Sequence, residues 1–96
     1  MVIGVLTVEY ALHGNDSLKG KRRVANSVKQ KTRNTFNVAI AEVETEESLT
    51  RLKLAVVSVS NSERHLTSRL TKCLSHLEAC CPEEMVYSDM EFYGIE

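Results

Sequence analysis

The stretch Val2–His13, VIGVLTVEYALH, decides the fold, because its composition and periodicity are those of a β-strand. From Thr7 onward strongly apolar side chains occupy every second position, as in a strand with one buried face. β-Branched residues, which favour strands, are frequent in it. Apolar residues also stand on both faces of its first half, with Ile3 and Val5 on one face and Leu6 and Val8 on the other. We therefore predict a strand here that has two apolar faces.

A helix is predicted directly after this strand, over residues 18–35. The segment HGNDS at 13–17 supplies turn residues, and Ser17 is suited to cap the helix. Apolar residues then recur at helical spacing, with Val24 at the flank: Leu18, Ala25, Val28 and Phe36. Gly20 takes the position where a capping box has glutamate, and glycine there costs about 1 kcal/mol relative to alanine.

The rest of the chain contains three more strands and one more helix. The strands are predicted over Asn37–Glu44, Arg51–Ser58 and Met85–Ile95, with TEESLT closing a hairpin between the first two. The helix follows SNSE, in which Ser60 and Glu63 have capping-box spacing. Its apolar stripe is clean and ends before Pro82, which stops the helix. The stripe consists of Leu66, Leu70, Cys73, Leu74 and Leu77.

The element order β-α-β-β-α-β predicts the fold class. Two right-handed crossovers joined by a central hairpin give an α+β, ferredoxin-like domain, with a four-stranded antiparallel sheet and both helices on one face. We expect one such domain over residues 1–96. The second face of the sheet then has no helix over it, and an uncovered face with apolar residues indicates a partner. We expect a homodimer through this face, with Ile3, Val5 and Thr7 as candidate contacts.

The charges are strongly segregated along the chain, although the net charge is only −1. Residues 17–41 carry seven lysines and arginines and no acid, whereas the chain from Glu78 onward carries six acids and no base. At 100° per residue, seven polar residues of the first helix share one face. We call this face the basic ridge: Lys19, Arg22, Arg23, Asn26, Lys29, Gln30 and Arg33.

Helix stability does not explain the basic ridge. No carboxylate lies three or four residues from these cations within the helix, so like charges repel at that spacing. Cations in the first turns also oppose the helix dipole. Two explanations stay open. In one, the acidic C-terminal segment lies near this helix or near that of a dimer mate and balances it. In the other, the ridge binds phosphates, and Asn26 and Gln30 add hydrogen bonds.

The chain resembles the YlxP-like family, small bacterial proteins known as a domain of unknown function. The matching segments are MVIGVLTVE at 1–9, SLKGKRRV at 17–24, RNTFNVAIAEV at 33–43 and VVSVSN at 56–61. The resemblance implies a ferredoxin-like fold, a cytoplasmic protein and genes beside translation initiation and ribosome-maturation factors. It supplies no catalytic residues. The chain departs from the family at Gly20, where glutamate is usual, and at Thr32, where a larger apolar residue is usual.

Several kinds of site are disfavoured by the sequence. The strand RLKLAVVSVS has no ring on which a base would stack, and Tyr10 is the only ring on the first strand. Cys73, His76 and Cys80 share a helix flank, but two of them fall in or beside the leucine stripe and no second ligand pair is present. His13 and His65 stand near element ends without an identified partner. Glu42 and Glu44 are spaced to share one solvated face of a strand.

We therefore expect a non-enzymatic accessory protein without a cofactor, a metal or a small-molecule substrate. Its three cysteines, two of them adjacent, do not form a disulfide framework and favour a reducing cytoplasm. The opening apolar run is too short for a membrane span or signal peptide. The leading hypothesis is association with structured RNA or the ribosome through the basic ridge. The alternative is a homodimeric protein-interaction module that uses the open sheet face, with the ridge only balancing charge.

Overall fold

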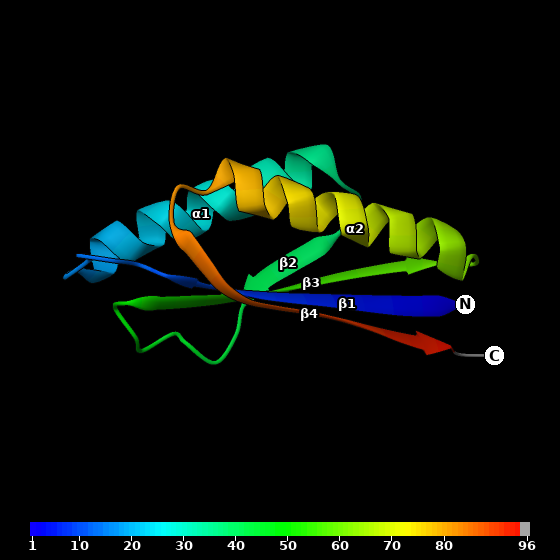
Figure 1. Cartoon of the computed structure of the whole chain (residues 1–96), viewed down its shortest axis with the longest axis horizontal. Helices are drawn as coiled ribbons and strands as arrows, with labels where there is room; N and C mark the ends of the chain where they lie inside the picture. Colours follow the sequence, from blue (N-terminus) through cyan, green and yellow to red (C-terminus); the bar gives the residue numbers. More distant parts are fainter. Residues whose placement is uncertain (95–96) are drawn as a thin grey trace.

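The structure, a computed structural model, describes residues 1–94 and confirms the predicted ferredoxin-like α+β fold. One antiparallel sheet with the order β2-β3-β1-β4 lies under two helices that share one of its faces (Figure 1). The elements are β1 (Val2–Ala11), α1 (Leu18–Thr35), β2 (Ala39–Glu42), β3 (Arg51–Ser60), α2 (Glu63–Cys80) and β4 (Glu84–Gly94). Neither helix is long and apolar enough to cross a membrane within the described residues.

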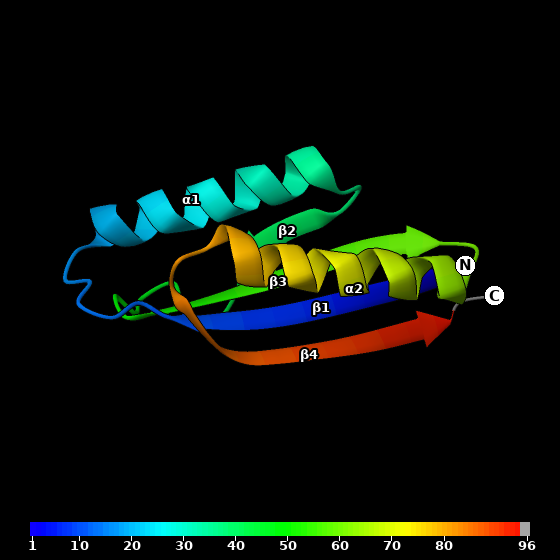
Figure 2. The same cartoon turned by 45° about the horizontal axis from the view of Figure 1, so that its top comes forward.

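Strand β1 forms the centre of the sheet. It pairs with β3 on one side and with β4 on the other along its whole length. Its even-numbered side chains face the helices, and Leu6, Val8 and Tyr10 are fully buried. The hydroxyl of Tyr10 donates a hydrogen bond of 2.7 Å to the carbonyl oxygen of Leu77 in α2. Figure 2 shows the result: α2 lies over the middle of the sheet and α1 lies toward the β2 edge.

The first helix has the predicted boundaries and the predicted cap. The Oγ of Ser17 accepts a hydrogen bond of 3.0 Å from the backbone N–H of Gly20. A Cβ at Gly20 would overlap Oδ1 of Asn15. The amide of Asn15 donates to the carbonyl oxygens of Ser17, at 2.9 Å, and Leu49, at 2.6 Å. Glycine therefore leaves room for an asparagine that ties the β1–α1 turn to the β2–β3 loop.

The predicted capping box of the second helix is wrong. Ser62 is the N-cap, and its Oγ accepts a hydrogen bond of 3.2 Å from the backbone N–H of His65. Ser60 is still part of β3, where it pairs with Val2. The strand continues two residues beyond its predicted end at Ser58, because β1 offers hydrogen-bond partners that far, and the helix begins later as a result.

The other strand boundaries differ from the prediction by one to two residues at most ends. Strand β1 ends at Ala11 instead of His13, and β4 begins at Glu84 instead of Met85; its predicted end at Ile95 lies outside the described residues. Strand β2 is only four residues long and does not include Asn37 or Glu44. Glu44 has a φ of 65°, which is incompatible with strand geometry, so the hairpin loop starts earlier than predicted.

The core-facing stripe of α1 also differs from the prediction. Lys21, Ala25, Val28 and Thr32 are the buried residues of this helix, whereas Leu18 is 45% exposed. Leu18 belongs to the first turn and points away from the apolar centre. Thr32 is fully buried, and its hydroxyl donates to the carbonyl oxygen of Val28 at 2.7 Å. A hydroxyl bonded within its own helix is tolerated in the core because no polar group is left unsatisfied.

Lys21 is buried, although it belongs to the strongly basic segment over residues 17–41. Only 1% of the residue is exposed. Its ammonium lies 2.7 Å from the carboxylate of Glu42 and donates to the carbonyl oxygens of Thr45 and Ser48, the latter at 2.6 Å. All the donors of the ammonium are thus used at the point where α1 meets the β2–β3 loop. The charge compensated by this contact is not available to an outside ligand.

Replacing Lys21 with alanine should strongly destabilise the protein. The change leaves the half-buried Glu42 carboxylate without its counter-ion and two carbonyl oxygens without a donor, a loss of about 3–5 kcal/mol for a buried pair. Urea denaturation measures the free energy of unfolding. Lys19→Ala, an exposed cation on the same helix, is the matched control and should change stability by less than about 0.5 kcal/mol. Equal effects of the two variants would contradict this role of Lys21.

The protein should lose stability in alkaline solution. Burial raises the pKa of the Cys73 thiol from 9.0 to about 11, and burial also raises the pKa of the Tyr10 hydroxyl. Groups whose pKa is raised by folding stabilise the native state fully below their unfolded pKa and lose that contribution as the pH rises toward the folded one. The free energy of unfolding should therefore fall between pH 9 and pH 11, as measured by urea titrations at both ends. Cys73→Ala should show a shallower decline.

Candidate nucleic-acid interface

The basic ridge forms one continuous face of α1 in the structure. Six of its seven side chains are exposed, and that of Lys29, at the flank of the buried stripe, is half-buried. From Lys19 to Arg33 the ridge is about 21 Å long at 1.5 Å per residue. The helix thus brings together all the residues that the sequence placed on this surface.

The cations of the ridge have no carboxylate partner among the described residues. The ion pairs among residues 1–94 involve other residues. They join His13 to Glu84, Lys21 to Glu42, Arg51 to Glu9 and Lys53 to Glu44. The guanidinium of Arg33 donates to the carbonyl oxygen of Ile40 at 3.1 Å, which holds this end of the ridge against β2. Of the remaining lysines and arginines of the ridge, Lys19, Arg22 and Arg23 are exposed and Lys29 is half-buried.

The acidic strand β4 does not lie beside α1 within one protomer. In the sheet order β2-β3-β1-β4, helix α1 packs toward β2, and β4 is the opposite edge. The prediction that the acidic last strand lies near the first helix is therefore wrong for a single chain. His13, for which the sequence identified no partner, does have one at the start of β4. Its Nε2 lies 2.7 Å from the carboxylate of Glu84.

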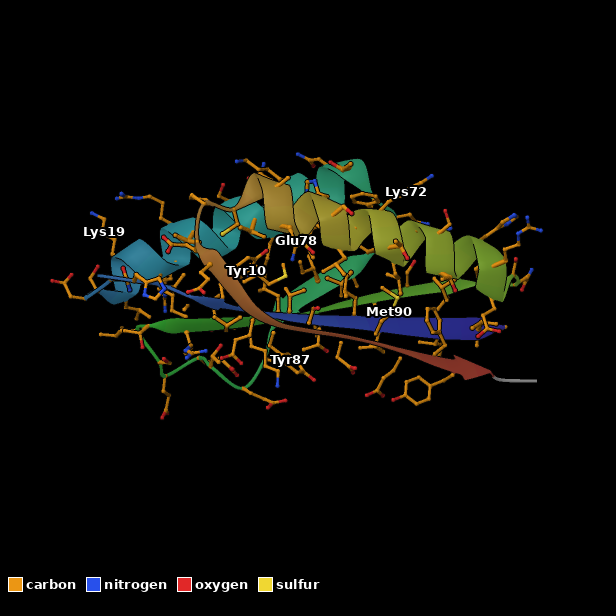
Figure 3. All side chains as sticks on the ribbon, in the orientation of Figure 1. Tyr10, Lys19, Lys72, Glu78, Tyr87 and Met90 are labelled. Carbon is orange, nitrogen blue, oxygen red and sulfur yellow. The ribbon has the colours of Figure 1, made fainter. Side chains whose placement is uncertain are left out.

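Charge is segregated between the layers of the molecule as well as along the sequence. Ten of the twelve lysines and arginines lie on the two helices, where Glu63 and Glu78 are the only acids. Figure 3 shows Lys19 and Lys72 pointing away from the sheet on the helix side, with Tyr87 on the opposite side. The contribution of α2 was missed in the sequence because its three cations are spread over nine residues and only the fold places this helix beside α1.

The open face of the sheet has an apolar centre. Register places Val57 of β3 beside Val5 and Val59 beside Ile3, and the predicted contacts Ile3, Val5 and Thr7 are all partly exposed. Toward the β2–β3 loop the face becomes charged, with Arg51 paired to Glu9 at 3.1 Å and Lys53 to Glu44 at 3.2 Å. No helix covers this face in the described part of the chain.

The two glutamates predicted to share a solvated face have separate environments. Glu42 lies opposite Leu54 on the helix side of the sheet and binds the buried Lys21. Glu44 lies beyond the end of β2 and binds Lys53 on the other side. The turn at Glu44 separates them, because its positive φ breaks the two-residue periodicity on which the expectation rested.

The cysteine–histidine flank of α2 packs inside the protein. Cys73 is fully buried in the core and Cys80 is half-buried. The ring of His76 meets that of Phe36 edge-on, with centroids 5.3 Å apart and planes at 71°. Within residues 1–94, no three histidine, cysteine or carboxylate side chains are placed to hold a metal ion together.

Comparisons with known proteins agree with this architecture. A family model described as protein of unknown function (DUF503) matches residues 3–90. The uncharacterized protein YlxP of Bacillus subtilis (strain 168) is 25% identical over 92 residues, which cover 96% of this chain and all of the relative. A solved structure described as protein YJCS superimposes with a TM-score of 0.53 at 10% identity, over 98% of this chain and 99% of the other. The last likeness concerns the fold alone.

Proposed function

The chain belongs to the DUF503 family of proteins of unknown function, and we propose that it is a non-enzymatic cytoplasmic accessory protein that binds structured RNA or the ribosome through the basic ridge. One observation carries this proposal: the ridge is a continuous row of exposed or half-buried cations without carboxylate partners among the described residues. The translation-linked gene setting that the family resemblance implies favours RNA over other polyanions.

The buried Lys21 strengthens the argument by contrast. Lys21 serves the fold and is fully paired, whereas the ridge cations have no carboxylate partner among the described residues, where Arg33 alone of these cations makes a hydrogen bond, to the carbonyl oxygen of Ile40. Like charges at helical spacing cost a few tenths of a kcal/mol per pair. A polyanion reverses the sign of this term, because each phosphate attracts several ridge cations and releases condensed counterions on binding.

The proposed contact is with phosphates and sugars instead of base edges. The ridge contains amides and cations but no aromatic side chain, so it has no platform on which a base would stack. Tyr10, the ring on the central strand, is buried under α2. Backbone contacts position a protein on nucleic acid without reading sequence. Recognition would then depend on the shape of the folded RNA.

Binding to structured RNA and to ribosomal subunits should weaken steeply with salt. If about four phosphates are neutralised, a plot of log affinity against log salt concentration should have a slope of about −3. Replacing Arg22, Arg23, Lys29 and Arg33 with glutamine should flatten this slope, as measured by filter binding or co-sedimentation over a salt series. Binding that is unchanged by the four substitutions would refute the proposal.

A matched pair of double variants locates the contact. Arg22→Gln with Arg23→Gln removes two ridge charges, and Arg64→Gln with Lys72→Gln removes two charges from α2. The ridge variant should reduce the salt slope by about 1.5 and the α2 variant by much less. Equal reductions would indicate that only the net charge matters.

A second candidate function is a homodimeric interaction module, which the apolar centre of the open sheet face favours. Val5 and Val57 are neighbours there, and Ile3 and Val59 extend the same patch. Half-exposed aliphatic side chains that adjoin one another without a covering layer are typical of interfaces between proteins. In this reading the second copy covers the patch, and the basic ridge stays on the outside of the dimer.

Val5→Lys should abolish a dimer formed by this face. The lysine would place two charges in an apolar interface, where they lose hydration without gaining partners. Sedimentation equilibrium of the parent protein should give the mass of a dimer, and the variant the mass of a monomer with an unchanged circular dichroism spectrum. A strictly monomeric parent protein would refute the sheet-face dimer.

A further inference from the structure

Strand β4 is a long edge strand that lacks most of the usual protection against pairing. It has eleven residues, lies at the end of the sheet order and pairs only with β1 among the described residues. Natural edge strands are typically blunted by short length, proline or lysine. The opposite edge, β2, has four residues, whereas β4 contains neither proline nor lysine, and its register shift lies near its start. From Tyr87 to Gly94 a regular outer edge is open to another strand.

The two faces of β4 differ in chemistry. On the open sheet face its side chains form a row that we call the edge row, Tyr87, Asp89, Glu91 and Tyr93. Both tyrosines of the row are about half exposed, at 50% and 49%. On the helix side Met90 and Phe92 are only partly buried, and Val86, at the register shift, is 40% exposed. The edge thus offers carboxylates and rings on one side and apolar surface on the other.

The acids of the edge row have no cationic partner within the described residues. The two cations of the open face are already paired, Arg51 with Glu9 and Lys53 with Glu44. The Tyr93 hydroxyl donates to the Glu91 carboxylate, which leaves the negative charge in place. The negative charge of Asp89 and Glu91 therefore disfavours an acidic strand at this edge and favours a basic one.

The charge of the edge row disfavours a second copy of this chain as the strand that pairs with β4. In an antiparallel β4–β4 pair, Asp89 and Glu91 of one chain would lie opposite or diagonal to the same carboxylates of the other. Like charges in those positions are destabilising, whereas opposite charges stabilise the pair. Tyrosine rings beside the carboxylates add a second attraction for cations. Lys53 already shows the preference, because its ammonium lies 5.9 Å from the centroid of the Tyr87 ring.

We propose that the outer edge of β4 binds an extended basic segment of a partner protein as a fifth strand of the sheet. The segment carries lysine or arginine at alternate positions, toward Asp89 and Glu91, and apolar residues between them, toward Met90 and Phe92. Main-chain hydrogen bonds supply affinity, and the alternating side chains supply specificity. This surface lies on the opposite edge of the sheet from the basic ridge, so the inference does not depend on RNA binding.

A hollow at the start of β4 extends the same surface. It is lined by Glu78 and Glu83 together with residues 85–88 of the strand. Helix α2 ends beside it with no basic residue in its last turn, so its terminal carbonyl groups also favour a cation there. A lysine near one end of the bound segment therefore has a place to enter.

The probe is a blocked, fluorescein-labelled nonapeptide with lysine at odd positions and valine or threonine at even positions. Fluorescence anisotropy at low salt should show saturable binding. A peptide of the same composition with its lysines clustered should bind at least tenfold more weakly, because it cannot alternate. A peptide with N-methyl groups on three central amides keeps every charge but cannot pair as a strand, and it should also lose at least tenfold. Equal binding of all three peptides would overturn the proposal.

Variants of the protein test whether the alternating peptide binds at β4. Asp89→Asn with Glu91→Gln should weaken binding of the alternating peptide at least tenfold. Glu46→Gln with Glu47→Gln, in the exposed β2–β3 loop, removes the same charge and should leave binding within about twofold. Arg22→Gln with Arg23→Gln should also leave it unchanged, which separates this inference from the RNA proposal. Amide chemical-shift changes centred on β4 support the proposal, and changes centred on β2 overturn it.

Discussion

The structure depends on β1, both edges of which are paired and one face of which is buried. Its edges carry β3 and β4, so the sheet has this strand as its hydrogen-bonded axis. Its even-numbered face is buried under the helices, and the Tyr10 hydroxyl fixes α2 through the carbonyl oxygen of Leu77. A slip of one residue in its register would turn Leu6, Val8 and Tyr10 toward the open face. The position of β4, and therefore of the edge proposed to bind a basic segment, follows directly from this strand.

Burial separates two kinds of cation on one helix. A lysine in the interior loses its hydration, and it is tolerated only when a counter-ion and hydrogen-bond acceptors replace the water. Glu42 and two loop carbonyl groups do this for Lys21. The ridge cations have no carboxylate partner in the described chain, and all of them except the half-buried Lys29 are exposed to solvent. Two neighbours in sequence, Lys21 and Arg22, thus have unrelated roles, one in the stability of the fold and one in the proposed binding of RNA.

The fold also places the basic and the acidic segments of the chain toward opposite edges of the sheet. The sheet order places the basic helix α1 and the acidic strand β4 on different sides, with the apolar centre of the open face between the two sheet edges. Because these surfaces are separate, a polyanion on the ridge and an extended basic segment on β4 can be bound together. A protein of this design would join an acidic and a basic partner while remaining nearly neutral itself.

The sequence by itself determined the element order, the fold class, the boundaries of α1 and the positions of the basic ridge. These are periodic features: apolar residues every second or every third to fourth position, and a helix that turns seven polar residues to one side. The tertiary structure alone decided that Lys21 is buried, that Glu42 and Glu44 separate, that Ser62 caps α2 and that β4 lies away from α1. Each of these depends on contacts between segments distant in sequence, and local periodicity contains no information about such contacts.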